Sequence, residues 1–223
     1  MSRLVVVTGG EGGIGRATAA RFEALGDEVR APGRTDLDVT DEASVAAFFE
    51  EQPVDVLVNN AGVAGSAPLP RTTLESWRKH LDVNATGAFL CTRAVVGGMR
   101  ERGRGTIVTV ASTAGRVGAP YTAAYTAAKH AAVGLMRATA AEVAGTGVTV
   151  NAVCPAFVDT PMTERSIDNI VERTGRSSEE ARAALGPLLD PGEVAAAIVW
   201  LASPEAAGIS GQTLVIDGGG IQT

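Results

Sequence analysis

The sequence predicts one α/β domain, residues 1–223, built on a doubly wound parallel sheet. Short apolar runs rich in β-branched residues are typical of strands covered on both faces. They occur at residues 4–7, 54–58, 106–110, 149–153 and 213–216. A glycine-rich turn joins the first run to an alanine-rich helix, as at the start of a nucleotide-binding α/β fold. A chain of 223 residues is long enough to bury a full core in one domain.

The glycine-rich turn, residues 8–15, predicts a dinucleotide site. A helix is expected from Arg16 to Leu25 and ends at Gly26. A turn of this kind lets backbone approach a pyrophosphate, which the helix N-terminus then stabilises. A flexible loop would explain the glycines alone, but the flanking strand and helix favour the nucleotide. The predicted contacts are Thr8, Gly9, Glu11, Gly12, Gly13, Ile14 and Gly15.

Three polar residues predict acid-base chemistry at the end of the strand 106–110. Tyr125 and Lys129 are four residues apart on an expected helix, so they share one face. A phenol has a reference pKa of about 10, and we expect the Lys129 ammonium to lower it toward neutrality. Ser112 can hydrogen-bond a substrate carbonyl oxygen there. Ordinary helix packing also produces this Tyr/Lys spacing, so the nucleotide site beside it is what favours function.

Further motifs follow in order. Asn59-Asn60-Ala61-Gly62 ends one strand, Asn84 lies in LDVNATGAF, the segment 151–155 reads NAVCP, and Asp217-Gly218-Gly219 lies near the C-terminus. Together with the two groups above, they make the chain resemble the short-chain dehydrogenase/reductase family from residue 4 to residue 220. The resemblance implies a fourth catalytic residue, Asn84, which perturbs the expected helix 74–102 and holds a proton-relay water. It also implies cofactor contacts by Asn59, Ala61, Gly62, Tyr125, Lys129, Pro155, Ala156, Val158 and Thr160.

The second strand, residues 27–31, bears on the choice of cofactor. Family members that prefer NAD carry an acidic residue at its end, where this chain has Gly33 followed by Arg34. A guanidinium suits the 2′-phosphate of NADP(H), so NADP(H) is favoured and NAD(H) is the alternative. Two observations oppose this choice. The glycine-rich turn carries Glu11 where NADP-binding relatives often have a basic residue, and Arg34 alone could be a solvated surface charge.

The chain departs from the family pattern after this strand. Only residues 32–37 lie between the second strand and Asp38. By resemblance, Asp38 and Val39 border the adenine of the cofactor. A parallel crossover needs about ten residues or more, usually a helix. The sequence therefore predicts that the helix after the second strand is missing and that the third strand is shortened or irregular.

Two further segments suggest a lid and an assembly. Residues 161–191 read as two short helices separated by Gly175, with Ser177 and Glu180 at capping-box spacing, and the resemblance makes this insert the substrate lid. The helix 125–144 is apolar almost all round, so both of its sides should be buried. We expect a homodimer or a homotetramer.

Composition excludes several other classes. A net charge of −6 and a pI near 5.0 argue against nucleic-acid binding. His80 and His130 lack partners at metal-ligand spacing, and Cys91 and Cys154 read as buried thiols, so no metal is expected. No apolar run approaches membrane-spanning length, so we expect a cytoplasmic protein that does not bind membranes.

The predicted activity is NAD(P)(H)-dependent interconversion of a carbonyl and a secondary alcohol. The sequence of residues 125–138 and 150–162 most resembles that of 3-oxoacyl (β-ketoacyl) thioester reductases. A dehydrogenase of simple, sugar or steroid alcohols is the alternative. A dinucleotide-sensing regulator without chemistry is less favoured, because all four catalytic positions are present.

Overall fold

The structure is a computed structural model that describes residues 2–221. Within these residues six parallel strands form one sheet in the order β2-β1-β3-β4-β5-β6, which confirms the predicted doubly wound α/β fold. The strands are β1 (Leu4–Val7), β2 (Glu28–Arg30), β3 (Val56–Asn59), β4 (Gly105–Val110), β5 (Val148–Pro155) and β6 (Thr213–Ile216).

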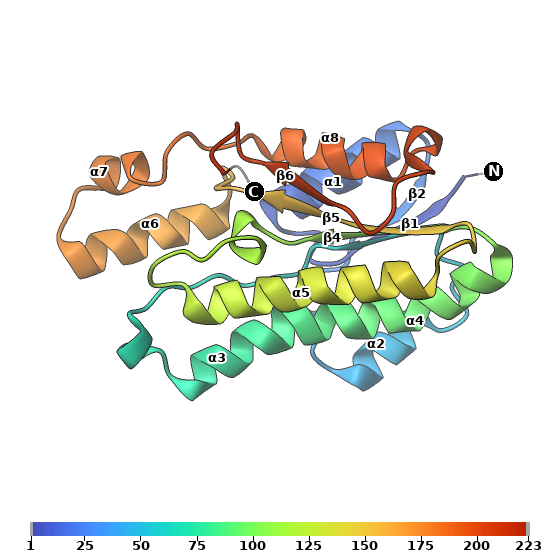
Figure 1. The fold of residues 1–223 in the computed structure, drawn as a ribbon, viewed down its shortest axis with the longest axis horizontal. Helices are drawn as coiled ribbons and strands as arrows, with labels where there is room; N and C mark the ends of the chain where they lie inside the picture. The colour runs from blue at the N-terminus through green and yellow to red at the C-terminus, as the bar shows by residue number, and fades with distance from the viewer. Residues whose placement is uncertain (1, 222–223) are drawn as a thin grey trace.

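Helices cover both faces of the sheet (Figure 1). One face carries α1 (Gly13–Ala24) and α8 (Pro191–Leu201), and the other carries α2 (Glu42–Phe49), α4 (Gly87–Arg102) and α5 (Ala123–Glu142). Side chains of a strand alternate between the two faces, so Val5 and Val7 pack with Phe22 of α1, whereas Val6 joins the cluster of Met99. The apolar strand pattern thus corresponds to two cores, one on each side of the sheet.

The connection after β2 contains neither a helix nor a strand. Residues 31–41 form turns and coil, which confirms the predicted loss of the helix. The third strand is not merely shortened but absent from the sheet. Leu37 and Val39 are nevertheless buried in the core cluster of α2 and α4, and Asp41 caps α2 by accepting from the Ala43 N–H at 3.0 Å. As a result, β2 lies at the edge of the sheet.

The segment predicted as one helix over 74–102 has three parts. α3 (Leu74–Leu81) passes into a π-helical turn, Asp82–Thr86, which passes into α4. A π turn carries one extra residue inside a helix and is frequently found at functional sites. Asn84 lies in this turn.

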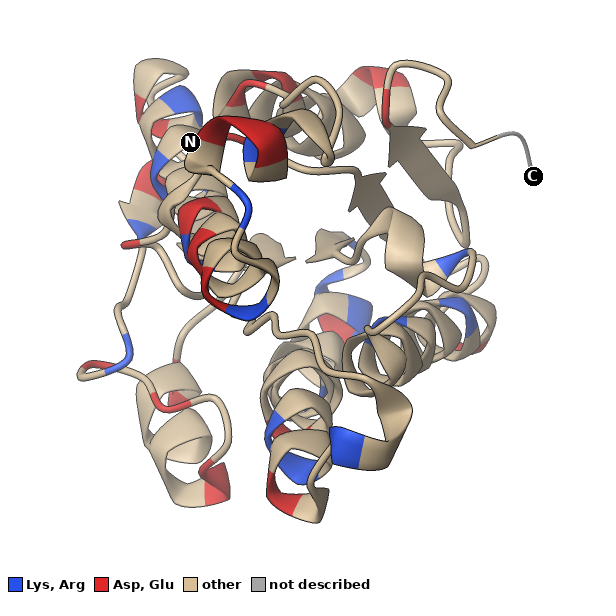
Figure 2. Ribbon diagram, turned by 90° about the vertical axis from the view of Figure 1, so that its left-hand side faces the viewer, with Lys and Arg blue, Asp and Glu red and all other residues tan. Residues whose placement is uncertain are grey.

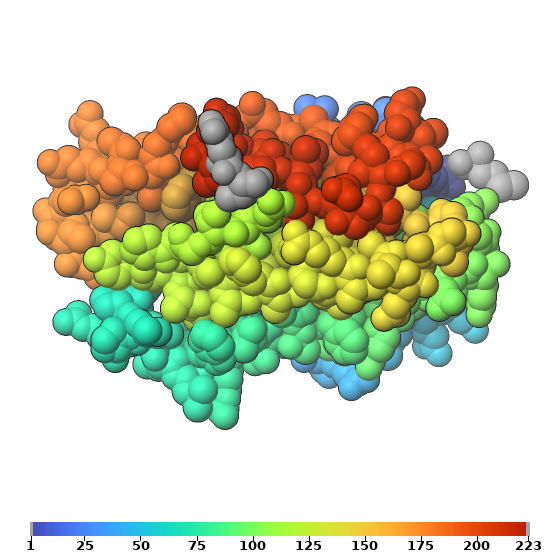
Figure 3. Space-filling model, in the orientation of Figure 1, coloured from blue at the N-terminus to red at the C-terminus, as the bar shows by residue number. Residues whose placement is uncertain are grey.

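Two more helices, α6 (Pro161–Thr174) and α7 (Ser178–Ala183), project at one end of the molecule (Figures 1 and 3). Gly175 ends α6 with φ of +69°, a left-handed conformation that favours glycine, and the predicted Ser177–Glu180 capping box is present. Short 3₁₀ turns occupy residues 69–71, 113–115 and 204–206.

Residues of both charge signs are spread over several helices in the view of Figure 2. Over residues 2–221, no helix is both long and apolar enough to span a bilayer. Cys91 and Cys154 are free and buried, as predicted.

Candidate active site

The glycine-rich turn lies between two other loops at the carboxyl ends of the strands. Gly9 has φ of +65°, and a Cβ there would lie 2.9 Å from the Ala61 Cα in the loop after β3. A Cβ on Gly13 would lie 2.5 Å from the Thr160 Cγ2 in the loop after β5. Side chains at these positions would push the three loops apart. The loops after β1, β3 and β5, which carry most of the predicted cofactor contacts, therefore meet.

Thr8 and Asn60 hold two of these loops together. The Thr8 Oγ1 accepts hydrogen bonds from the backbone N–H groups of Asn60 and Ala61 at 3.1 and 3.0 Å. In return, the Asn60 Nδ2 donates to the carbonyl oxygens of Thr8 and Gly9 at 2.9 and 3.0 Å. The sequence analysis assigned no role to Asn60, although it lies inside the quoted Asn-Asn-Ala-Gly motif.

The neighbouring Asn59 side chain is turned the other way. It is 5% exposed, and its Nδ2 donates to the Thr92 Oγ1 of α4 at 2.9 Å. This amide therefore ties β3 to α4. Any contact between Asn59 and the cofactor would have to come from its backbone.

The N-terminus of α1 is open to an anion. Gly12, Gly13, Ile14 and Gly15 begin this helix, and no side chain caps it. By contrast, α2, α6 and α8 each begin with a capping side chain. The first N–H groups of a helix lack intrahelical partners and attract phosphate. Together with the Gly9 and Gly13 close approaches, this uncapped helix fits the pyrophosphate of a dinucleotide.

Ser112, Tyr125 and Lys129 converge beyond the end of β4. The Ser112 Oγ accepts from the Ala114 N–H at 3.1 Å, which leaves its own proton to donate, and it hydrogen-bonds the Tyr125 phenol. The Lys129 Nζ lies 5.8 Å from the Tyr125 ring centroid and donates to the Val110 carbonyl at 2.8 Å. The predicted grouping of these three residues is therefore present.

The expected effect of Lys129 on the tyrosine is not present in this structure. Burial raises the pKa of Tyr125 above 10.0, while the Ser112 hydrogen bond acts in the opposite direction. Burial also lowers the pKa of Lys129 to about 8, and its ammonium is directed to the Val110 carbonyl. Desolvation penalises both charged forms, so the phenol here is held in its protonated form.

Asn84 stabilises the π turn. Its Nδ2 donates to the carbonyl oxygens of Val63 and His80, both at 3.0 Å, and its Oδ1 accepts from the Val63 N–H at 3.1 Å. A Cβ on Gly62 would lie 2.8 Å from this Oδ1 and 3.6 Å from the Lys129 Nζ, so a side chain at position 62 would fill the space between these two polar groups. Both amide hydrogens of Asn84 are donated to protein carbonyls, and its role in a proton relay stays a prediction.

The other predicted contacts lie around this centre. Pro155 ends β5, Ala156 follows, Val158 bridges to Leu189, and Thr160 caps α6. On the adenine side, the largely exposed Arg34 side chain pairs with Asp38 at 3.6 Å, whereas the buried Val39 packs against Gly87 of α4. Val39 is thus a core residue as well as a predicted cofactor neighbour.

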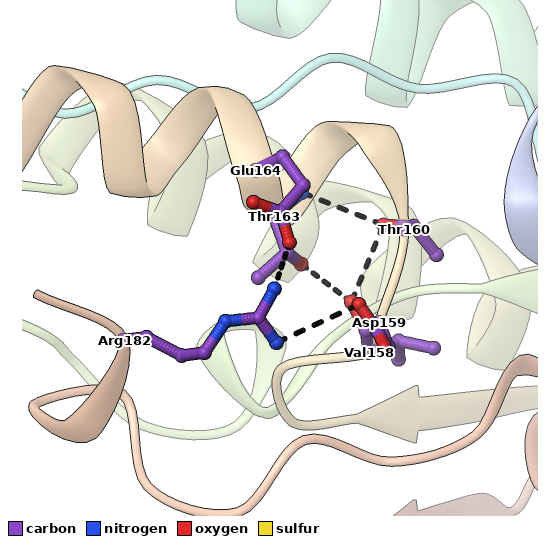
Figure 4. A network of polar contacts seen from close by, with 6 residues as sticks. All are labelled: Val158, Asp159, Thr160, Thr163, Glu164 and Arg182. Atoms are coloured by element: carbon purple, nitrogen blue, oxygen red, sulfur yellow. Dashed lines mark hydrogen bonds and ion pairs between the residues drawn. The ribbon is translucent and has the colours of Figure 1, made fainter. Parts of the chain in front are cut away.

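The base of the projecting helices carries a polar network (Figure 4). Arg182 of α7 pairs with Glu164 of α6 and, at 3.8 Å, with Asp159. The Thr163 Oγ1 donates to the Val158 carbonyl at 2.6 Å. Farther along α6, the Arg173 Nη1 donates to the Ser66 carbonyl at 2.6 Å. Helices α6 and α7 are therefore tied both to the segment after β5 and to the loop after β3.

An open glycine-rich turn, a buried lysine and a hydrogen-bonded Ser–Tyr pair at the same sheet edge define a nicotinamide-dependent oxidoreductase. The family model described as enoyl-(acyl carrier protein) reductase matches residues 12–220. The chain belongs to the short-chain dehydrogenase/reductase family.

Individual relatives cover nearly the whole chain. It is 40% identical to a monensin polyketide synthase putative ketoacyl reductase from Streptomyces virginiae, over 98% of this chain and 97% of the relative. It is 42% identical to a putative ketoacyl reductase of Streptomyces coelicolor, over 97% and 87% of the two chains. A solved structure of an actinorhodin polyketide ketoreductase variant with NADPH is 34% identical, with a TM-score of 0.87 over 98% of this chain and 97% of that chain.

Proposed function

We propose that this protein is an NADPH-dependent 3-oxoacyl thioester reductase, with NADH as the alternative cofactor. The observation that carries the proposal is the grouping of Ser112, Tyr125 and Lys129 beside an uncapped, glycine-lined helix N-terminus. The relatives' names support the substrate class, and the NADPH of the solved ketoreductase supports the cofactor. Arg34 remains the proposed reader of the 2′-phosphate.

The residues divide the work of carbonyl reduction. When bound, the nicotinamide supplies a hydride to the carbonyl carbon. Ser112 donates a hydrogen bond to the carbonyl oxygen, and Tyr125 donates its phenolic proton to that oxygen as negative charge develops there. A raised tyrosine pKa keeps the proton in place until then. Lys129 holds the ribose, and Asn84 keeps the π turn in shape.

We further propose that residues 161–191 are the substrate lid. Arg173 already spans from α6 to the Ser66 carbonyl, and this contact would have to open for a long acyl chain to enter. Arg165, Arg173 and Arg176 lie on or beside α6, where their positive charges can attract the phosphate of an acyl carrier arm.

The activity is tested by following NADPH and NADH oxidation with acetoacetyl thioesters and a panel of plain ketones. We expect NADPH turnover on the thioesters, and loss of roughly 10²–10⁴-fold in kcat for Tyr125→Phe with unchanged cofactor affinity. Retained activity in Tyr125→Phe would overturn the assigned acid. Turnover confined to plain ketones or sugars would favour the alternative dehydrogenase, and cofactor binding without any turnover would favour the sensor.

A cytoplasmic homodimer or homotetramer is also proposed. The outward residues of α5 include Ala131, Gly134 and Ala138, which are exposed in the single chain, and small residues allow helices to approach closely. Light scattering of the purified protein measures the assembly, and a monomeric mass at working concentration would contradict it. Fractionation of the source cells tests the location.

A further inference from the structure

The Glu11 side chain crosses from the glycine-rich turn to the loop after β2. A Cβ built on Gly33 would lie 2.4 Å from the Glu11 Cδ and 2.5 and 2.7 Å from its two carboxylate oxygens. The two segments are also joined by their backbones, since the Gly10 N–H donates to the Pro32 carbonyl at 3.1 Å. The carboxylate of Glu11 therefore occupies the space that a side chain at position 33 would fill.

In a dinucleotide-binding fold, position 33 lies where the adenosine ribose of the cofactor is recognised. About twenty residues beyond the glycine-rich turn, an acidic side chain hydrogen-bonds the adenosine ribose hydroxyls of NAD, or a nearby arginine accommodates the 2′-phosphate of NADP. This chain has no side chain at Gly33, but it has Arg34 beside it. The geometry therefore places a carboxylate from the first loop where the second strand provides none.

We propose that Glu11 is a cofactor-specificity residue that acts against Arg34. Its carboxylate accepts hydrogen bonds from the ribose hydroxyls of NADH and repels the 2′-phosphate of NADPH, whereas Arg34 attracts that phosphate. This inference rests on the proposed binding of a nicotinamide dinucleotide. It narrows the preference for NADPH over NADH, because the affinity for NADPH is held below what Arg34 alone would give.

Nearby charged side chains do not compete with a ligand for the Glu11 carboxylate. Among the ion pairs formed within residues 2–221, none includes the Glu11 carboxylate. Arg16 donates to the Glu11 backbone carbonyl rather than to its side chain. The second acid nearby, Asp36, already accepts from the Gly33 N–H at 3.2 Å.

Arg34 is equally able to turn toward a ligand. Its side chain is 85% exposed and contacts Asp38 at 3.6 Å. Exposed pairs of this kind contribute little, so a bound phosphate can displace Asp38. Opposite charges thus flank the ribose position from two different loops.

The test measures NADPH and NADH affinity by nicotinamide fluorescence, and kcat/KM for both, in four variants. Glu11→Gln keeps the size of the side chain and removes its charge, so the NADPH/NADH preference should rise about tenfold. Arg34→Gln should lower it. Gly33→Ala should raise it as well, because the new methyl group displaces the carboxylate. Glu28→Gln, an equal charge change on β2 away from the turn, should leave the preference unaltered.

The outcomes separate the two levels of proposal. If Glu11→Gln and Gly33→Ala change the affinity and kcat/KM for both cofactors equally, or leave them unchanged for both, the specificity role of Glu11 is wrong while the enzyme assignment stands. If the wild-type protein binds neither cofactor in the fluorescence titration, the proposed function fails and this inference fails with it. Circular dichroism of each variant confirms that the fold is retained.

Discussion

Two buried threonines should respond oppositely to the same substitution, because only one of them has hydrogen-bond partners. Thr8 is 1% exposed, and its Oγ1 accepts from two backbone N–H groups in the loop after β3. Thr18 of α1 is 0% exposed, and its Oγ1 has no partner among the described residues. Replacing threonine by valine keeps the shape and removes the hydroxyl in both cases.

The expected magnitudes follow from these contacts. Thr8→Val leaves two N–H groups without an acceptor, at about 1–2 kcal/mol each, so the free energy of unfolding should fall by about 2–4 kcal/mol. For a chain of this length that corresponds to a lower Tm by on the order of 10 °C. Thr18→Val removes a buried hydroxyl that bonds to nothing, so stability should rise by up to about 1 kcal/mol.

Urea unfolding of both variants at one protein concentration measures the difference. Thr8→Ser keeps the acceptor and loses only a methyl group, so it should cost about 1 kcal/mol and serves as the matched control. If Thr8→Val and Thr18→Val shift the unfolding midpoint in the same direction and by similar amounts, the reasoning from hydrogen-bond satisfaction is refuted.

Three other predictions concern buried ionisable groups and the glycine-rich turn. Because burial lowers the pKa of Lys129 from 10.5 to about 8, the unfolded chain holds this proton between those pH values and the folded chain does not. Subtracting the Lys129→Met stability profile from the wild-type profile should therefore leave a rise with pH across that window of up to about 3 kcal/mol, and a flat difference would contradict it. Burial raises the pKa of Cys91 to about 12 and also raises that of Cys154. A thiol reagent at neutral pH should therefore label neither cysteine in the native protein and both after denaturation, and rapid labelling of the native protein would contradict this. Gly10→Ala would place a Cβ 2.4 Å from the Ala31 carbonyl oxygen and should cost about 1–3 kcal/mol in urea unfolding, so an unchanged midpoint would show that the turn yields freely.

The grouping of Ser112, Tyr125 and Lys129 could be predicted because it depends on spacing. Tyr125 and Lys129 share a face at any helical spacing of four, and Ser112 lies just beyond a strand end, where parallel strands place ligands. The missing crossover helix was also predictable, since residues 32–37 are too few to form one. The face shared by Tyr125 and Lys129 follows from helical periodicity, whereas the missing helix was predicted from the short spacing to Asp38 and Val39, which the family resemblance assigns to the adenine side.

Features that depend on the balance of competing interactions could not be predicted. Spacing placed Lys129 beside Tyr125, but it could not predict the burial that raises the pKa of the phenol or the hydrogen bond from the ammonium to the Val110 carbonyl. The resemblance implied that Asn84 perturbs the helix, but not that its side chain hydrogen-bonds the Val63 backbone, which comes from a distant loop. Likewise, the approach of Glu11 to Gly33 joins two loops whose separation no local pattern encodes.

The missing third strand leaves β2 with one row of backbone groups that no neighbouring strand pairs. Such an edge is a template for association with another chain, and short length and charged side chains are what discourage it. β2 has three residues, and its exposed first and last residues are Glu28 and Arg30. Because the third strand is missing, the edge of the sheet is β2, whose short length and charged ends resist aggregation. Variants of this edge made to change cofactor binding should therefore keep one charge at each end of β2.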